Sequence, residues 1–300
     1  MRVVELSGGV GGARLGRGLA RLDGVDLTIV VNVGDDDEIH ELYISPDLDT
    51  VIYTLAGVEG PEGWGRAGDS FRLNDELAEF GVDNTFRLGD LDTALHIYRT
   101  GRLREGELLS SVTAEVCAAF GIGTRVLPAS DDRVRTVVGT AEGEWISFQE
   151  YFVMRRAAET VTGLRFDGAE DAKPAPGVID AIAEADLVVI GPSNPPLSIW
   201  PILAIPEIEE AVAAHPRVVA LSPLIGGRTV KGPAARVMAS LGLAAGNPGV
   251  VRAYRGLLTG LVIDSGDDPT ELEGVEVLAT PIMIRDPDQA HRLAAEIVAW

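Results

Sequence analysis

The chain has 300 residues, a formal net charge of −21 and a mean hydropathy of +0.16. Its hydrophobic content of 46% is enough for a sizeable core, and no apolar run reaches the length of a membrane span. The acidity argues against nucleic acid and anionic membranes as partners, because those surfaces need clustered Lys and Arg. A single cysteine, Cys117, and the absence of a basic-then-apolar leader predict a cytoplasmic protein.

The first half of the chain begins with a strand, a small-residue turn, a helix and a second strand. Residues 2–6 are predicted as the first strand, 7–12 as the turn, and 13–22 as a helix with leucines at helical spacing. The strand at 27–33 completes a unit whose two strands should be parallel neighbours. From about 50 to 125 helical patterns replace the strand signals, which indicates a helical insertion.

The second half returns to alternating strands and helices. Residues 133–139 and 145–153 alternate around a turn and predict a β-hairpin. Strands at 187–190 and 217–221 are each followed by a turn and a helix-like run. The pattern predicts an α/β fold with a Rossmann-like, mostly parallel sheet, forming a single domain over 1–300.

The first turn, Ser7–Arg14, reads SGGVGGAR and is a candidate ligand site. Small residues after a strand leave the backbone free to approach an anion, and the following helix offers its N-terminal N–H groups. The dinucleotide fingerprint fails, because Arg14 stands where a third glycine is needed, and no Walker lysine follows. A plain tight turn is the alternative. The candidate nucleotide- or phosphate-binding residues here are Gly8, Gly9, Gly11, Gly12 and Arg14.

Carboxylates gather directly after the second strand. Asp35 or Asp36, together with Asp49 at the start of the next apolar run, has the oxygen chemistry that suits Mg²⁺. Asp37 and Glu38 are more typical of a solvated turn. A helix-capping role is the alternative for Asp49.

A second acidic turn carries Asp90 and Asp92 ahead of a helix with His96. Either carboxylate could reach the same metal or act as a general base towards a hydroxyl, and capping is equally open for Asp92. A lone histidine on a helix is more often structural than catalytic.

Two loops of the second half also suit phosphate. The loop GPSNPPLSI offers side-chain donors and acceptors, with a proline-stiffened turn as the alternative. The loop SPLIGG precedes a lysine, a scarce cation in so acidic a chain. The candidates in these loops are Ser193, Asn194, Ser198, Ser222, Gly226 and Lys231.

Taken together, these segments resemble the 2-phospho-L-lactate transferase family of deazaflavin coenzyme F(420) biosynthesis. The motifs that carry the resemblance are GGVGGAR, VVNVGDD, SPDLDTVIYTL, the Gly-Asp turn at Asp90, VLPASDDR, FQEYFV, GPSNPPLSI and SPLIGG with a following KG. They run in order to Asp286-Pro287, so the resemblance covers essentially the whole chain.

The resemblance implies a Mg²⁺-dependent transfer of a phosphoenolpyruvyl or 2-phospho-L-lactyl group. The donor would be linked to guanosine diphosphate, the acceptor would be the ribityl hydroxyl of the deazaflavin Fo, and GMP would leave. Asp35 and Asp49 would hold the metal, and Asp36 or Asp90 would accept the hydroxyl proton. The acceptor-binding set would be Asp49, Asp90, Leu91 and Asp92.

One departure from the family pattern concerns the acceptor. The usual turn GDRDLATH is here GDLDTALH over 89–96, so Leu91 replaces an arginine. Two other readings stand beside the transferase, a nucleotide-binding regulator and a dinucleotide-dependent dehydrogenase in which Asp35 would bind a ribose. The broken glycine fingerprint counts against the dehydrogenase. The apolar C-terminal helices predict a homodimer contact.

Overall fold

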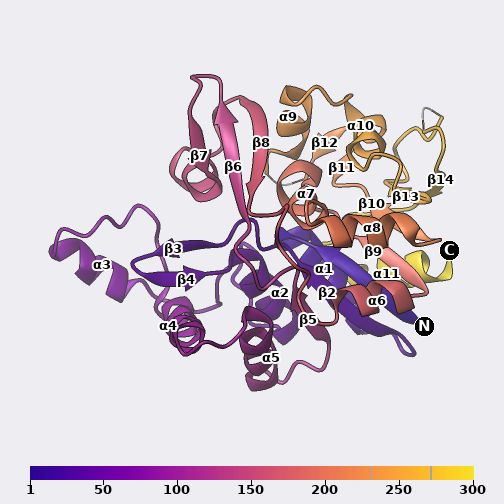
Figure 1. Ribbon diagram of the computed structural model, residues 1–300. Coiled ribbons are helices and arrows are strands. Elements are labelled where there is room, and N and C mark those ends of the chain that lie inside the picture. The colour runs from indigo at the N-terminus through magenta and orange to yellow at the C-terminus, as the bar shows by residue number, and fades with distance from the viewer. Residues whose placement is uncertain (231, 271) are drawn as a thin grey trace.

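A seven-stranded parallel sheet lies at the centre of residues 1–230, 232–270 and 272–300, which the computed structural model describes (Figure 1). Its strand order is β14-β13-β10-β9-β1-β2-β5. These strands are β1 (Arg2–Ser7), β2 (Asp26–Val31), β5 (Arg125–Pro128), β9 (Leu187–Ile190), β10 (Val218–Leu221), β13 (Gly260–Ile263) and β14 (Glu276–Ala279). All six neighbouring pairs are parallel, which confirms the predicted α/β fold.

The strand order reverses its direction at β1. This strand pairs with β2 on one side and with β9 on the other, so Val3 lies opposite both Leu27 and Leu187. The chain builds outwards from β1 through β2 to β5, then crosses back to β9 and builds the other half. The pairing of β1 with β2 confirms the predicted parallel neighbours.

Helices flank the sheet in two groups (Figure 1). Helix α1 packs against α2 and α11, whereas α6 packs against α8. The described α-helices are α1 (Gly9–Ala20), α2 (Pro46–Ala56), α3 (Arg72–Glu79), α4 (Asp90–Arg104), α5 (Leu109–Ala119), α6 (Val178–Glu184), α7 (Trp200–Leu203), α8 (Pro206–Ala214), α9 (Ala234–Ser240), α10 (Gly246–Ala253) and α11 (Pro287–Ala299). Two π-helices are η1 (Glu150–Met154) and η2 (Pro195–Ile199).

Three small antiparallel sheets stand beside the main one. The predicted hairpin is present and gains a third strand, in the order β7-β6-β8. Its second strand is shorter than predicted, because it ends at Ser147 and η1 follows. The strands of these sheets are β3 (Asp37–Ile39) with β4 (Leu42–Ile44), β6 (Arg135–Thr140) with β7 (Trp145–Ser147) and β8 (Val161–Asp167), and β11 (Leu224–Ile225) with β12 (Arg228–Thr229).

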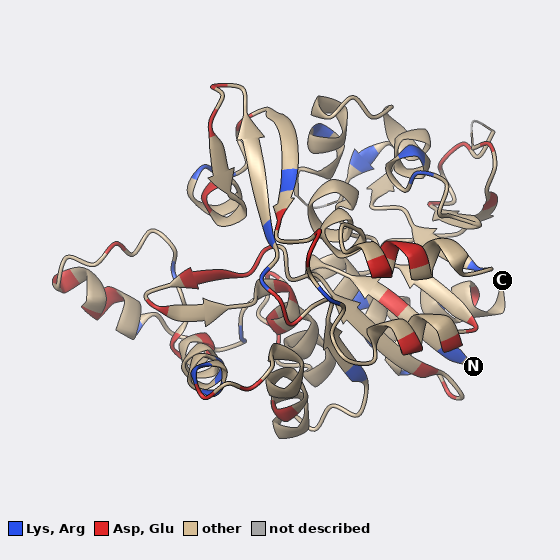
Figure 2. Cartoon of the chain, in the orientation of Figure 1, with Lys and Arg blue, Asp and Glu red and all other residues tan. Residues whose placement is uncertain are grey.

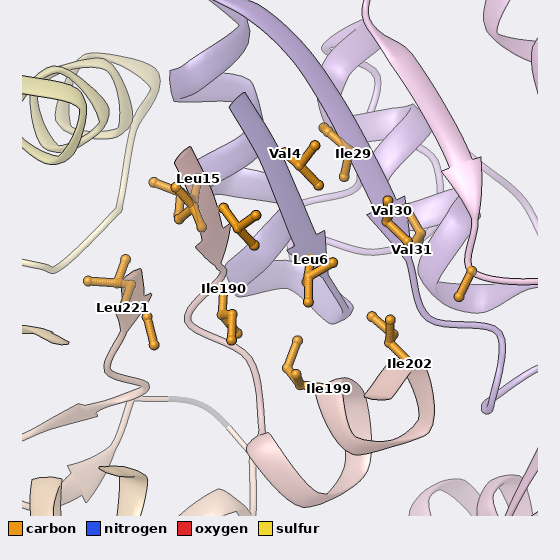
Figure 3. Packing of buried hydrophobic residues seen from close by; sticks show 14 of the residues in the cluster. Val4, Leu6, Leu15, Ile29, Val30, Val31, Ile190, Ile199, Ile202 and Leu221 are labelled. Atoms are coloured by element: carbon orange, nitrogen blue, oxygen red, sulfur yellow. The ribbon is translucent and has the colours of Figure 1, made fainter. Parts of the chain in front are cut away.

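The apolar core continues to the carboxyl edge of the sheet. Leu6, Ile190 and Leu221 come from the last or next-to-last positions of neighbouring strands, and all are fully buried. Ile199 and Ile202, from η2 and α7, pack below these strand ends (Figure 3). Apolar packing therefore fixes the strand ends from which the loops of this edge depart.

The region between β4 and β5 holds four helices with different surroundings. Helix α2 packs on α1, and α5 packs on β5, so both belong to the layers around the main sheet. Helix α3 buries only Asn74 and projects with α4 away from the sheet (Figure 1).

Helix α11 uses its apolar face inside the chain. Ala290 comes so close to Gly18 of α1 that a Cβ on this glycine would lie 2.3 Å from the Ala290 carbonyl oxygen. The apolar face of α11 therefore packs at least in part against α1, and the homodimer stays a prediction. Among the described residues, no helix combines the length and the apolar character needed to cross a membrane.

Glu5 is an unusual occupant of the central strand. Its side chain is fully buried, and neither carboxyl oxygen has a hydrogen-bond partner in the described part of the chain. Gly16 and Gly191 make room for it, because a Cβ on either would lie 2.6 or 2.9 Å from a Glu5 oxygen. Burial raises the pKa of this carboxyl well above its usual value, because the charged form loses its hydration.

We expect Glu5→Leu to raise the free energy of unfolding by about 1–3 kcal/mol at neutral pH, since it removes a buried polar group without a partner. The wild type should lose stability as pH rises above the ordinary glutamate pKa, because only the unfolded chain ionises readily there. Urea unfolding at several pH values measures both effects. Glu276→Gln, at an exposed position of β14, is the control. Equal pH dependence of wild type and Glu5→Leu would contradict this account.

Candidate functional site

Two loops meet where the strand order reverses, one after β1 and one after β9. The Ser193 hydroxyl donates to the Gly8 carbonyl and accepts from the Gly8 N–H at 3.3 Å. A Cβ on Gly11 would lie 2.4 Å from the Pro192 carbonyl oxygen, so glycine is needed for this approach. The crevice at such a switch point is where open α/β sheets bind ligands.

A cavity of about 640 Å³ lies at this edge, within the size range of small-molecule and cofactor sites. Most of the residues predicted to bind nucleotide or phosphate line it: Gly8, Gly9, Gly11, Arg14, Ser193, Asn194, Ser198 and Ser222. The structure thus brings both loops of the second half to the glycine turn of the first.

Three predicted phosphate-binding residues are not part of the described wall. Gly12 packs below the turn, where a Cβ would lie 2.3 Å from the Ser7 hydroxyl. Gly226 lies in the turn between β11 and β12, and its N–H donates to Asp267 at 2.8 Å. Lys231 lies outside the described residues.

Asp47 connects the two sides of the site. Its Oδ1 accepts from the Gly9 N–H at 2.7 Å, and its Oδ2 accepts from the Asn32 amide at 2.9 Å. Asn32 in turn accepts from the Gly34 N–H at 2.8 Å. One carboxylate in the first turn of α2 therefore ties the loop after β1 to the loop after β2.

Asp35 lines the cavity beside Asp47. Its Oδ1 is buried and has no hydrogen-bond partner among the described residues. Burial and the neighbouring Asp47 both raise the pKa of Asp35 well above its usual value, and burial raises the pKa of Asp47 to about 6. Neither carboxyl forms an ion pair with a described residue, so a bound cation would relieve their repulsion.

Asp49 has a different partner. Arg99 of α4 donates hydrogen bonds to both of its oxygens, from Nη1 to Oδ2 at 3.1 Å and from Nη2 to Oδ1. Both side chains are buried, and His96 lies one turn before Arg99 with its Nδ1 at 3.6 Å from Asp49. Asp49 is not the helix N-cap, because Ser45 holds that position.

Asp36 is not among the residues that line the cavity. It is buried and accepts from the Ser45 hydroxyl at 3.1 Å. Burial raises its pKa to about 7, against the opposing effects of the Arg135 and Arg99 guanidinium groups. The structure therefore places this predicted base outside the described wall.

Asp90 of α4 caps the start of α3, and Asp69, which precedes α3, caps the start of α4. Asp90, the first residue of α4, accepts from the Ser70 hydroxyl and from the Leu73 N–H of α3 at 3.0 Å. Asp69 accepts from the Leu91 N–H of α4 at 2.8 Å. The hydrogen bonds lower the pKa of Asp90. Neither Asp90 nor Leu91 lines the cavity, so this predicted base is placed in a structural exchange of caps.

Asp92 is the carboxylate of the second acidic turn that does line the cavity. Burial raises its pKa to about 6, the nearby Tyr53 lowers it, and Asp49 adds to the rise. A carboxyl with a pKa near 6 is suited to exchange a proton at neutral pH.

The described cavity wall carries more acid than base. Its carboxylates are Asp35, Asp47, Asp49 and Asp92, whereas its arginines are Arg14 and Arg87. Elsewhere acidic residues are spread over many elements rather than gathered in one block (Figure 2). The carboxylates of the cavity are therefore a local feature of the fold and not simply part of a uniformly acidic surface.

Sequence reasoning did not assign Asp47, Arg99 or Gln149 to the site. Gln149 donates to the Asp35 carbonyl at 2.6 Å from beyond β7. Only Asp47 had a local signal, since it stands two residues before Asp49 in an acidic first helical turn. Arg99 and Gln149 approach from distant segments, and no local spacing indicates them.

Comparison with known proteins places the chain in a family. The family model described as 2-phospho-L-lactate transferase CofD matches residues 3–292. The chain belongs to this family. It is therefore a transferase, and the resemblance read from its motifs is confirmed.

Relatives of this transferase match it along their whole length. A 2-phospho-L-lactate transferase of Methanopyrus kandleri is 45% identical over 303 residues, covering 99% of this chain and 97% of that protein. A phosphoenolpyruvate transferase of Streptomyces griseus is 45% identical over 318 residues, covering 100% of both. The crystal structure of protein BH3568 from Bacillus halodurans shares the fold, with a TM-score of 0.69 at 18% identity over 99% of this chain and 98% of that one.

We expect Gly11→Ala to lower the free energy of unfolding by about 1–3 kcal/mol, because its Cβ would force the two loops apart. Gly101→Ala is the matched control, since this helical glycine of α4 faces open space. It should be neutral or stabilise by up to about 1 kcal/mol. Urea unfolding measures both variants, and equal effects would show that the contact with Pro192 is not tight.

Proposed function

We propose that this transferase moves a phosphoenolpyruvyl or 2-phospho-L-lactyl group from a guanosine-diphosphate-linked donor to the ribityl hydroxyl of the deazaflavin Fo, with release of GMP. The relatives at 45% identity carry the names of both transfers, so the family supports the reaction class and leaves the two acids as alternatives.

The observation that carries the proposal is the meeting of amide-rich loops and carboxylates in one cavity. The first turn of α1 offers backbone N–H groups to the phosphates of a nucleotide, with Ser193 and Asn194 across the crevice. Asp35 and Asp47 line the same cavity, and Asp47 is joined to the turn through the Gly9 N–H. Transfer at a diphosphate needs positioning and charge neutralisation more than a nucleophilic side chain, and this arrangement supplies both.

Mg²⁺ fits the oxygen chemistry of this wall. Asp35 has a buried oxygen without a partner, and Asp47 is the carboxyl next to it. No group of three or more His, Cys, Asp and Glu side chains poised for a metal occurs in the described part of the chain. Mg²⁺ commonly takes one or two carboxylates and completes its shell with phosphate oxygens and water. Bound there, the ion would neutralise charge on the donor phosphates.

We assign Asp35 and Asp47 as the first candidates to hold this ion, and Asp49 stays a prediction for the same role. Arg99 already neutralises Asp49, although each carboxylate oxygen keeps a second lone pair.

We assign Asp92 to accept the proton of the acceptor hydroxyl, because Asp49 is paired with Arg99 and an Asp92 oxygen has no partner among the described residues. The hydroxyl oxygen forms the new bond to phosphorus, the bond from that phosphorus to the bridging oxygen breaks, and GMP leaves. Trp64 lines the cavity and offers aromatic surface to a flat ring system. Trp64 is about half exposed, which leaves it free to cover a ligand.

The direct test incubates the protein with Mg²⁺, Fo and each of the two guanosine-diphosphate-linked donors. We expect one new acidic deazaflavin product and one equivalent of GMP, read by mass spectrometry. Tight guanine-nucleotide binding without any product would favour a regulatory protein instead.

The same assay separates the two carboxylates of the second acidic turn. Asp92→Asn should lower kcat by about two to four orders of magnitude, as expected for loss of a general base. Asp90→Asn should retain most of the turnover and lose stability, because it weakens a helix cap outside the cavity. The reverse pattern would restore Asp90 as the base.

Metal binding is tested with Asp35→Asn. Without divalent ions this variant should unfold at a higher temperature than the wild type, because it removes one of two buried carboxyls that repel each other. MgCl₂ should then stabilise the wild type much more than the variant. Glu38→Gln, exposed on β3, is the control. An equal response of the wild type and Asp35→Asn to Mg²⁺ would remove Asp35 from the metal site.

A further inference from the structure

Helix α4 points two side chains at Asp49, one turn apart. Arg99 binds both oxygens of this carboxylate, and its Nη1 also lies 3.3 Å from the His96 Nδ1. Both residues are only 2% exposed, so water does not compete for these contacts. Sequence reasoning treated His96 as more typical of a structural residue.

The contact with Arg99 decides which ring nitrogen of His96 carries the proton. A guanidinium group has only donors and stays protonated at any ordinary pH. A hydrogen on Nδ1 would point at those donors, and the nearest Asp49 oxygen, at 3.6 Å, is too far to accept it. Nδ1 is therefore the acceptor, and the ring is neutral with its hydrogen on Nε2. Burial and the Arg99 charge also lower the pKa of His96 to about 4, against the pull of Asp49.

The Nε2–H group has no acceptor among the described residues, and His96 lines the cavity. A ligand oxygen at this position would accept a hydrogen bond from Nε2–H. Asp49 lies beside His96, and Tyr53 and Asp92, which interact with each other near Asp49, line the same cavity. A donor there among carboxylates suits an uncharged carbonyl or hydroxyl oxygen rather than another anion.

We propose that His96 binds the acceptor substrate through a hydrogen bond from Nε2–H, and that Arg99 is the positioning residue that fixes this tautomer. The proposal rests on the proposed function for the identity of the ligand. It gives the buried pair of Arg99 and Asp49 a second role besides charge neutralisation, namely to orient a donor that faces the cavity.

Binding of Fo alone, followed by its fluorescence in the absence of any donor, tests the inference without turnover. His96→Phe keeps a flat ring and removes the N–H, so it should weaken Fo binding about tenfold. Its affinity for GDP should stay unchanged. His96→Gln, which regains an N–H donor, should recover part of the loss. His291→Phe, on the exposed side of α11, should bind Fo as the wild type does.

The tautomer has its own readout. Ring ¹⁵N spectra of histidine-labelled protein, with His96→Phe to assign the signal, should show a protonated Nε2 and a bare Nδ1. Arg99→Lys keeps a positive charge near Asp49 but loses the planar pair of donors, so it should disturb this pattern and weaken Fo binding.

Unchanged Fo affinity in His96→Phe, or a protonated Nδ1 in the wild type, would overturn the inference while leaving the transfer reaction intact. A wild type that binds no Fo would overturn the proposed function and this ligand together.

Discussion

The candidate site depends on how one carboxylate is held. Asp47 bonds the Gly9 N–H at one oxygen and the Asn32 amide at the other, so three chain segments are fixed relative to one another at the carboxyl edge of the sheet. Its neighbour Asp35 is left with a buried oxygen that nothing in the described chain satisfies. The fold therefore holds Asp47 and the loops it bonds in fixed positions, and it leaves Asp35 without a positive charge beside it among the described residues. Such a site is built to be completed by what it binds.

The fold was predictable from the sequence because its signals are local. The apolar strand of β1 and the glycine turn after it define the first crossover, and the strand of β9 with its proline-rich loop defines the second. Parallel pairing then brings both loops to one edge without any further information. The candidates Gly8, Gly11 and Ser193 meet there for this reason.

The partners of the carboxylates were not predictable, because side-chain pairing depends on how helices turn in space. Asp49 and Arg99 are 50 residues apart, and no spacing rule connects them. Asp90 and Asp92 stand two residues apart on one helix, so they point in different directions, one to the cap of α3 and the other to the cavity. From the sequence alone, both aspartates are equally plausible as the base. The orientation of α4 shows which of them lines the cavity.

The exchange of caps between α3 and α4 also determines how this part of the molecule can open. Helix α3 buries a single residue, so apolar packing contributes little to holding it, and the hydrogen bonds of Asp69 and Asp90 hold the junction instead. The segment between the two helices brings Phe86, Arg87 and Leu88 to the cavity wall. Its amide hydrogens should therefore exchange with solvent through a local opening, at a rate independent of the stability of the main sheet. This part of the cavity wall and the core of the main sheet would then behave as two separate cooperative units within one chain.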